Sequence, residues 1–200
     1  MKAAAKYPMF LEQHKTFRVL GVDDTPFART QSAPVPIAGV VCAGTRFEGM
    51  LWSSVTRDGS DANDRLVEII RACKFYDQLH AVLIDGIALA GFNVVDLPDL
   101  AQRLDLPCLS VMRKLPDMPG IILALERMGP QEKARRLPLI EKAGPIFQHG
   151  PFCYQVQGVS PDLAGRMLSS VTDNGHVPEA LRLAHLIGSA VATGQSSKRA

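Results

Sequence analysis

Two short apolar runs in this sequence end on acidic side chains. Residues 17–22 lead into Asp23 and Asp24, and residues 81–84 lead into Asp85, which a glycine follows. Apolar runs of this length, rich in Val, Leu and Ile and bounded by turn residues, predict buried strands. Carboxylates at the ends of two adjacent strands would offer a divalent cation oxygen ligands on a rigid support. The alternative is that these aspartates only begin turns. Because clustered carboxylates repel one another unless a cation is bound, the pair favours a metal site.

Other polar residues lie where they could serve the same site. Asp58 follows the third extended run and would add a third carboxylate; its alternative role is to cap the next helix, which Asp61 could equally do. Lys114 follows another apolar run. It would neutralise a phosphate or the charge that develops on a leaving oxygen, unless it is only an exposed charge at a strand end. Arg113 is the weaker phosphate contact, because successive strand residues face opposite sides.

The composition is that of an ordinary globular protein. The chain has 200 residues, of which 46% are hydrophobic and 21% charged, and its formal net charge is +2. This size predicts one domain, 1–200, with flexible ends at 1–14 and 195–200. The mild charge permits a nucleic-acid partner, but the basic residues between 113 and 142 could equally form a solvated helix face. Four cysteines without metal-ligand spacing are expected to be buried thiols. No apolar run suits a signal sequence or a membrane span, so a cytoplasmic protein with no membrane partner is expected.

The order of the predicted elements favours an α/β fold. Three extended runs joined by short loops predict antiparallel strands, and later runs separated by helical patterns predict parallel strands. The expected strands cover 17–22, 35–42, 46–55, 79–84 and 107–112. The expected helices cover 62–73, 94–104, 119–128, 131–142, 161–172 and 178–194, with a weak strand pair at 146–148 and 152–156. This order predicts a mixed five-stranded sheet flanked by helices. Asp23 and Asp85 share one edge of it if the first and fourth strands are neighbours.

Five segments spread over the chain resemble segments of endonuclease V. They are Gly-Val-Asp at 21–23, Arg-Asp-Gly at 57–59, Leu-Ile-Asp-Gly-Ile-Ala at 83–88, Leu-Ser-Val-Met-Arg-Lys at 109–114 and Val-Pro-Glu-Ala-Leu-Arg-Leu-Ala-His at 177–185. Residues 86–93 and 178–182 match still more closely a mainly archaeal family known as domain of unknown function 99, also called endonuclease dU. The chain therefore resembles a member of that family, within the ribonuclease H-like fold.

The resemblance implies a divalent-metal-dependent endonuclease that hydrolyses nucleic acid containing deaminated bases, uracil or hypoxanthine, in DNA repair. It implies Mg²⁺ or Mn²⁺ as the cofactor and DNA as the partner, with RNA left open. The implied catalytic residues are Asp23, Asp58, Asp85 and Lys114, with the three aspartates as metal ligands and Arg113 and Lys114 as phosphate contacts. Asp24 and Asp61 are candidate supporting carboxylates, and Asp24 could equally only cap a turn. The candidate base pocket is the loop with Gly86, Ile87, Ala88, Gly91 and Asn93, because glycines allow close backbone approach. The alternative is that this loop only turns the chain.

The sequence also departs from endonuclease V. Asp58 replaces the usual glutamate, no Tyr-x-Pro-Gly wedge occurs, and residues 158–161 stand where Gly-His-Arg is usual. Without a wedge, single-stranded or mismatched substrates are expected to be preferred. The alternatives are a non-catalytic nucleic-acid-binding protein and a hydrolase of small phosphate esters. His185 is interpreted as a packing residue, and the oligomeric state stays open. Phe47 and Trp52 are expected in the core; the alternative for Trp52 is an exposed ring that stacks on a base.

Overall fold

The computed structural model describes residues 13, 15–28 and 33–197 of the chain. Most of the ends that were expected to be flexible lie outside the described residues, and the single-domain organisation stays a prediction. In the described part of the chain, no helix is both long and apolar enough to cross a membrane. The four cysteines are all unpaired, and three of them are buried.

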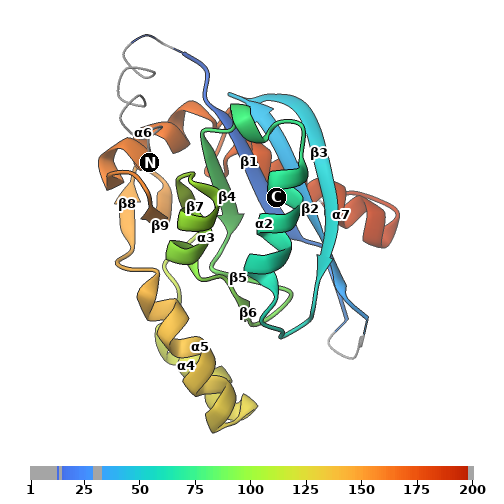
Figure 1. The fold of residues 1–200 in the computed structure, drawn as a ribbon, viewed down its shortest axis with the longest axis vertical. Coiled ribbons are helices and arrows are strands. Elements are labelled where there is room, and N and C mark those ends of the chain that lie inside the picture. The colour runs from blue at the N-terminus through green and yellow to red at the C-terminus, as the bar shows by residue number, and fades with distance from the viewer. Residues whose placement is uncertain (1–12, 14, 29–32, 198–200) are drawn as a thin grey trace.

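A seven-stranded mixed sheet forms the centre of the structure (Figure 1). In spatial order its strands are β3 (Arg46–Val55), β2 (Val35–Ala43), β1 (Arg18–Asp24), β4 (Ala81–Asp85), β7 (Cys108–Met112), β9 (Phe152–Gln157) and β8 (Phe147–His149). The first three pair antiparallel, β1, β4 and β7 pair in parallel, and β9 and β8 return to antiparallel pairing. The predicted mixed α/β sheet is confirmed, and the first and fourth strands are neighbours.

The expected number of strands was too low, because five were predicted for the sheet. The weak strand pair predicted beyond residue 145 joins the main sheet as β8 and β9. Strand β9 pairs along the open side of β7, from Cys108 opposite Gln157 to Met112 opposite Cys153. The hydrophobic pattern indicated that these strands exist, but a pattern within one strand does not identify its neighbour in the sheet.

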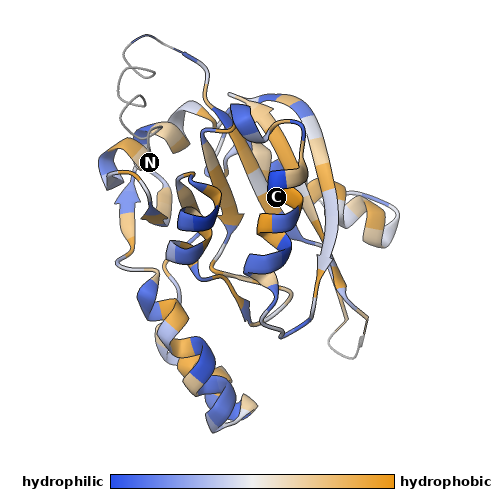
Figure 2. Ribbon diagram, viewed as in Figure 1, coloured by the Kyte–Doolittle hydropathy of each residue, from blue (hydrophilic) through white to orange (hydrophobic). Residues whose placement is uncertain are grey.

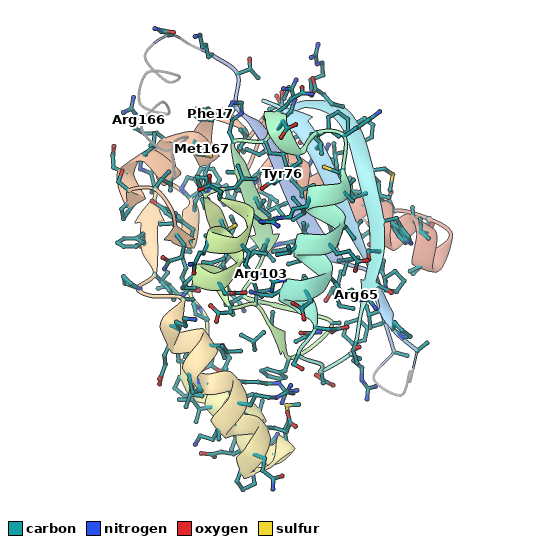
Figure 3. All side chains as sticks on the ribbon, in the orientation of Figure 1. Phe17, Arg65, Tyr76, Arg103, Arg166 and Met167 are labelled. Carbon is teal, nitrogen blue, oxygen red and sulfur yellow. The ribbon has the colours of Figure 1, made fainter. Side chains whose placement is uncertain are left out.

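Helices cover both faces of the sheet. They are α2 (Ala62–Ala72), the short 3₁₀ helix η2 (Tyr76–Gln78), α3 (Leu97–Leu104), α4 (Met118–Met128), α5 (Pro130–Lys142), α6 (Pro161–Ser170) and α7 (Glu179–Thr193). Leu20 and Val22 of β1 belong to the core on the side of α2 and α3, whereas Val19 belongs to the core on the side of α6 and α7. Figure 2 shows hydrophobic colour along the central strands and hydrophilic colour on the outer surfaces of α2 and α3. Arg103 of α3 (Figure 3) links the two helices, because its Nη1 is 2.8 Å from Oδ1 of Asp64 in α2.

Helix α3 begins three residues later than the predicted start at 94. Residues 93 and 94 instead form β6 (Asn93–Val94), which pairs with β5 (Ala88–Leu89) in a small separate hairpin. The helix begins after Asp96, whose side chain accepts a hydrogen bond from the Asp99 amide, and Pro98 lies in its first turn. This hairpin follows directly after β4, so it lies beside the carboxyl end of that strand.

Two parts of the fold are less covered by neighbouring elements than the rest, the edge strand β3 and the helical hairpin of α4 and α5. Strand β3 is an edge of the sheet, and Phe47 and Trp52 on it are 49% and 42% exposed, so their expected place in the core was wrong. Helix α7 packs against β1 and β2 and leaves the outer part of β3 uncovered. Helices α4 and α5 form a helical hairpin that projects away from the sheet (Figure 1). The hairpin packs on β6 through Val94, Leu125 and Ile140.

Candidate metal centre

Asp23 and Asp85 lie side by side at the carboxyl ends of parallel strands. Val22 of β1 is in register with Ile84 of β4, so the next residues along each strand, Asp23 and Asp85, meet at the same edge. One carboxylate oxygen from each and one ring nitrogen of His185 all lie within 4.8 Å of one another. The sequence predicted the two aspartates from their strand-end positions, and the structure brings them together.

The third member of this group, His185, is supplied by the last helix. Its Nδ1 lies 2.8 Å from Asp23 Oδ2, so it is a member of the site, and its interpretation as a packing residue was wrong. Helix α7 reaches β1 because Gly21 has no side chain: a Cβ there would lie 2.5 Å from the carbonyl carbon of Ala180. The available sequence signal was the segment at 177–185, which ends on this histidine and resembles endonuclease V.

The carboxylates of this site carry an electrostatic cost. Burial, and next the nearby charge of Asp85, raise the pKa of Asp23 from 3.8 to about 7, although the hydrogen bond with His185 opposes the shift. Burial also raises the pKa of Asp24, against the hydrogen bond that its carboxylate accepts from the Ala90 amide. A bound cation would offset both the burial and the mutual repulsion of these groups.

A hollow of about 500 Å³ opens over this group. Its lining residues are Asp23, Asp24, Pro26, Asp85, Gly86, Ala88, Met112, Arg113, Lys114 and His185. Arg113 and Lys114 follow the last residue of β7, so strand alternation no longer separates them and both line the hollow. Arg113 Nη2 lies 3.4 Å from Asp85 Oδ2. Acidic and basic side chains therefore share one open hollow, an arrangement that suits a cation together with a phosphate.

Asp58 and Asp61, which were also predicted for this site, lie outside both the group and the hollow above it. Asp58 Oδ1 accepts a hydrogen bond of 2.9 Å from the Phe92 amide, and its Oδ2 lies 3.3 Å from Arg57 Nε. Asp61 occupies the N-cap position of α2, but its carboxylate accepts hydrogen bonds from Thr56 and Asn93 instead of capping the helix. The structure thus brings together two of the three expected aspartates and adds a histidine.

The expected base-pocket residues are divided between different surroundings. Gly86 and Ala88 line the hollow over the carboxylates, and Gly86 has a φ of +79° that favours glycine. Ile87 packs against the hydrophobic core. Gly91 lines a second hollow beside Asp58. Asn93 is fully buried, and its amide bonds the Ala62 N–H, the Thr56 carbonyl and Asp61, so it joins segments of the fold and does not line a pocket.

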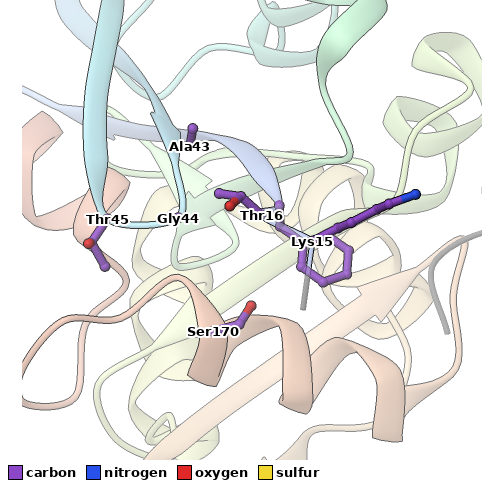
Figure 4. A pocket seen from close by; sticks show the side chains of 7 residues that line it. Lys15, Thr16, Ala43, Gly44, Thr45 and Ser170 are labelled. Carbon is purple, nitrogen blue, oxygen red and sulfur yellow. The ribbon is translucent and has the colours of Figure 1, made fainter. Parts of the chain in front are cut away.

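A further hollow, of about 410 Å³, lies at the amino end of β1 (Figure 4). Its lining residues are Lys15, Thr16, Phe17, Ala43, Gly44, Thr45 and Ser170. None of them is acidic, and they lie at the opposite end of β1 from Asp23. This hollow has no carboxylate ligands for a cation, so we assign the metal-binding potential to the carboxyl end of the strand.

The donor set at that end fits a divalent cation. Two carboxylates from rigid strand ends point oxygen atoms at a common volume, and such oxygens are the ligands of Mg²⁺ and Mn²⁺. The hydrogen bond with His185 fixes the orientation of Asp23, as partners behind metal ligands commonly do. Burial and the charge of Asp85 raise the pKa of Asp23, and the positive charge of a bound cation would lower it again.

Comparisons with known proteins found a matching family profile and several similar proteins. A sequence profile of the family described as endonuclease dU matches residues 15–192. The chain is 37% identical over 191 residues to a UPF0215 protein of Methanothermobacter thermautotrophicus, covering 94% of this chain and 93% of that one. It is 32% identical to a protein of unknown function from Archaeoglobus fulgidus, whose crystal structure superposes with a TM-score of 0.81 over 88% of this chain and 98% of that one.

More distant similarity extends to endonuclease V. The Ciona intestinalis enzyme, solved in complex with a DNA that contains inosine, superposes with a TM-score of 0.54 at 14% identity, over 86% of this chain and 84% of that one. At this identity the comparison establishes the shared fold. The profile match and the curated relatives also establish the family, and this chain belongs to the endonuclease dU family.

Proposed function

We propose that this protein is a Mg²⁺- or Mn²⁺-dependent endonuclease that cuts nucleic acid at deaminated bases, uracil or hypoxanthine, in DNA repair. The observation that carries the proposal is the meeting of Asp23, Asp85 and His185 within 4.8 Å, in a hollow that Lys114 also lines. Family membership supports nuclease chemistry. The inosine-containing DNA bound to Ciona endonuclease V supports a damaged nucleic acid as the partner.

The side chains of the hollow have distinct expected roles. Asp23 and Asp85 would hold the cation, which supplies Lewis-acid polarisation of the phosphate and counter-charge for the transition state. Lys114 and Arg113 would contact the phosphate oxygens and stabilise the negative charge that develops on them. His185 orients Asp23 through Nδ1, and its imidazole can take up or release a proton during cleavage.

Selective cleavage tests this function. The purified chain is incubated with Mn²⁺ or Mg²⁺ and end-labelled oligonucleotides that carry one uracil, one hypoxanthine or neither, as single strands and as duplexes. We expect cutting near the altered base, faster in single-stranded or mismatched substrates, because no wedge residue offsets the cost of unstacking a paired base.

Asp85→Asn tests the assignment of the site, and Asp77→Asn is its matched control. Both remove one carboxylate, but Asp77 is exposed and precedes β4, at the opposite end of that strand from Asp85. We expect Asp85→Asn to abolish cleavage and Asp77→Asn to retain it. Full activity of Asp85→Asn at limiting metal would disprove the assigned site. Lesion binding without any cleavage by the unmodified chain would favour the non-catalytic alternative.

A further inference from the structure

A second hollow, of about 660 Å³, lies next to the carboxylate hollow. It is lined by Phe27, Arg57, Asp58, Gly91, Phe92, Ala124, Arg127 and Met128, which come from the loops after β1, β3 and β5 and from helix α4. Its size is in the range of ligand-binding pockets. Pro26 lines the carboxylate hollow and Phe27 lines this one, so one short segment borders both. The Asp24 carboxylate also bonds Ala90, the residue before Gly91.

We propose that this second hollow binds one unpaired nucleobase of the strand that is cut, and that Arg57 and Asp58 select a deaminated base by its lactam edge. The inference rests on the proposed function, because it identifies how that site chooses its substrate. Phe27 and Phe92 are partly exposed and would supply ring surfaces for stacking, which every base accepts. Arg127 is exposed at the end of α4 and would contact a neighbouring phosphate.

The wall of this hollow is held in place by a buried arginine. Arg136 of α5 is 2% exposed, and its guanidinium donates hydrogen bonds to the backbone carbonyls of Phe92 (2.7 Å) and Asp58. Its Nη1 is paired with Glu132. A buried charge is costly unless it is paired and hydrogen-bonded, so these contacts fix the helical hairpin firmly against both loops. The hollow is therefore preformed, which lowers the entropic cost of binding a ligand in it.

The backbone and side chain of Asp58 are also fixed. Its φ is +51°, its N–H donates to the Ala90 carbonyl at 2.9 Å, and its Oδ1 accepts from the Phe92 amide. The side chain is still 34% exposed, and an ionised carboxylate only accepts hydrogen bonds, with capacity for about four. Arg57 beside it is a donor only. The hollow thus presents an acceptor and a donor next to each other.

Deamination creates the complementary pair of groups on a base. Uracil and hypoxanthine carry a carbonyl next to a ring N–H, whereas cytosine and adenine carry an amino group next to a bare ring nitrogen. The N–H would donate to Asp58 and the carbonyl would accept from Arg57. With the parent bases both contacts become unfavourable. The bare ring nitrogen, an acceptor, would face the Asp58 carboxylate, and the amino group, a donor, would face Arg57. Guanine and thymine share the lactam edge, so this pair separates a deaminated base from its parent and not from those two.

Binding measured in a metal chelator tests the proposal without cleavage. Fluorescence anisotropy with labelled single strands compares uracil with cytosine, and hypoxanthine with adenine, at one fixed position. We expect the unmodified chain to bind the deaminated member of each pair at least about tenfold more tightly. Asp58→Asn should bring this ratio close to one, because a rotated amide can donate to the bare nitrogen. Asparagine tolerates the positive φ at this position, so the variant is expected to fold.

Two further variants separate selection from general binding. Phe92→Ala should weaken all four oligonucleotides alike. Glu126→Gln removes one negative charge from the same helical hairpin without touching the hollow, and the ratio should stay unchanged. A tenfold ratio that survives Asp58→Asn would overturn the proposal. The cleavage assay with Mn²⁺ distinguishes this failure from failure of the proposed function. If the unmodified chain cuts at uracil and Asp58→Asn retains the binding ratio, only the role of the second hollow is refuted. If the unmodified chain neither cuts nor discriminates, both proposals are refuted.

Discussion

A methyl group at Gly21 is expected to push apart the two elements that build the carboxylate site. A Cβ at this position would lie 2.5 Å from the Ala180 carbonyl carbon and 2.6 Å from the Leu181 amide nitrogen. These are backbone atoms and cannot rotate away, so helix α7 must shift by about 1 Å to restore ordinary contact. Overpacking of this kind costs about 1–3 kcal/mol. Each kcal/mol lowers the Tm of a chain of this size by about 2–4 °C.

The same shift is expected to weaken the site. His185 lies on α7, and its 2.8 Å contact with Asp23 would lengthen beyond hydrogen-bonding distance if the helix moved outward. Gly21→Ala should therefore melt earlier and also gain less stability from Mn²⁺, because a ligand stabilises the folded state in proportion to its occupancy. Thermal unfolding followed by circular dichroism, with and without Mn²⁺, measures both effects.

Gly188→Ala is the matched control on the same helix. A Cβ at Gly188 would meet Thr25 at 3.4–3.5 Å, which is ordinary contact. Since glycine inside a helix costs about 1 kcal/mol relative to alanine, Gly188→Ala should raise the Tm slightly and leave the Mn²⁺ effect intact. If Gly21→Ala melted like the unmodified chain and kept its full Mn²⁺ stabilisation, the packing argument would be refuted.

Three other predictions address charge. Because the pKa of Asp23 is raised to about 7, the apo protein should lose stability as pH rises from about 4 through 7. Cation affinity should fall up to tenfold per pH unit below 7, and calorimetry of Asp23→Asn should show both trends weakened. Hydrogen bonds from Arg18 and Arg46 lower the pKa of Glu48 to about 2, so Glu48→Gln should lower the Tm at pH 7, and this difference should vanish as pH falls from 4.5 towards 2. Lys114→Ala should slow cleavage about 100-fold without changing the Mn²⁺ effect on Tm.

The sequence allowed prediction of the features that depend on local patterns. Apolar runs bounded by turn residues located strands β1 and β4. The positions of Asp23 and Asp85 at the ends of these strands predicted that their carboxylates meet. Prolines and helical spacing placed most helices within a few residues. These features depend on side-chain periodicity and backbone propensity, which the chain carries within each segment.

The features that were missed depend on contacts between distant segments. His185 has the helical spacing of a packing residue, and only the docking of α7 on β1 brings it to Asp23. Asn93 lies in the short strand β6 and Asp58 in the loop after β3, and hydrogen bonds to segments distant in the sequence orient both side chains. Trp52 follows an alternating pattern typical of a half-buried strand, but it is exposed because its strand lies at the edge of the sheet. No pattern within one segment carries such information.

The span of chain between Asp23 and His185 also determines when the site can exist. The two residues are separated by 162 positions, and the hydrogen bond between them joins the first strand to the last helix. During synthesis the strands and most helices leave the ribosome well before α7 does, and domains tend to fold as units once their parts are available. The carboxylate pair can form once β1 and β4 are available, but His185 joins it only after α7 has been made, 162 positions after Asp23. The cluster of Asp23, Asp85 and His185 is therefore completed after the strands that carry its carboxylates have already been made.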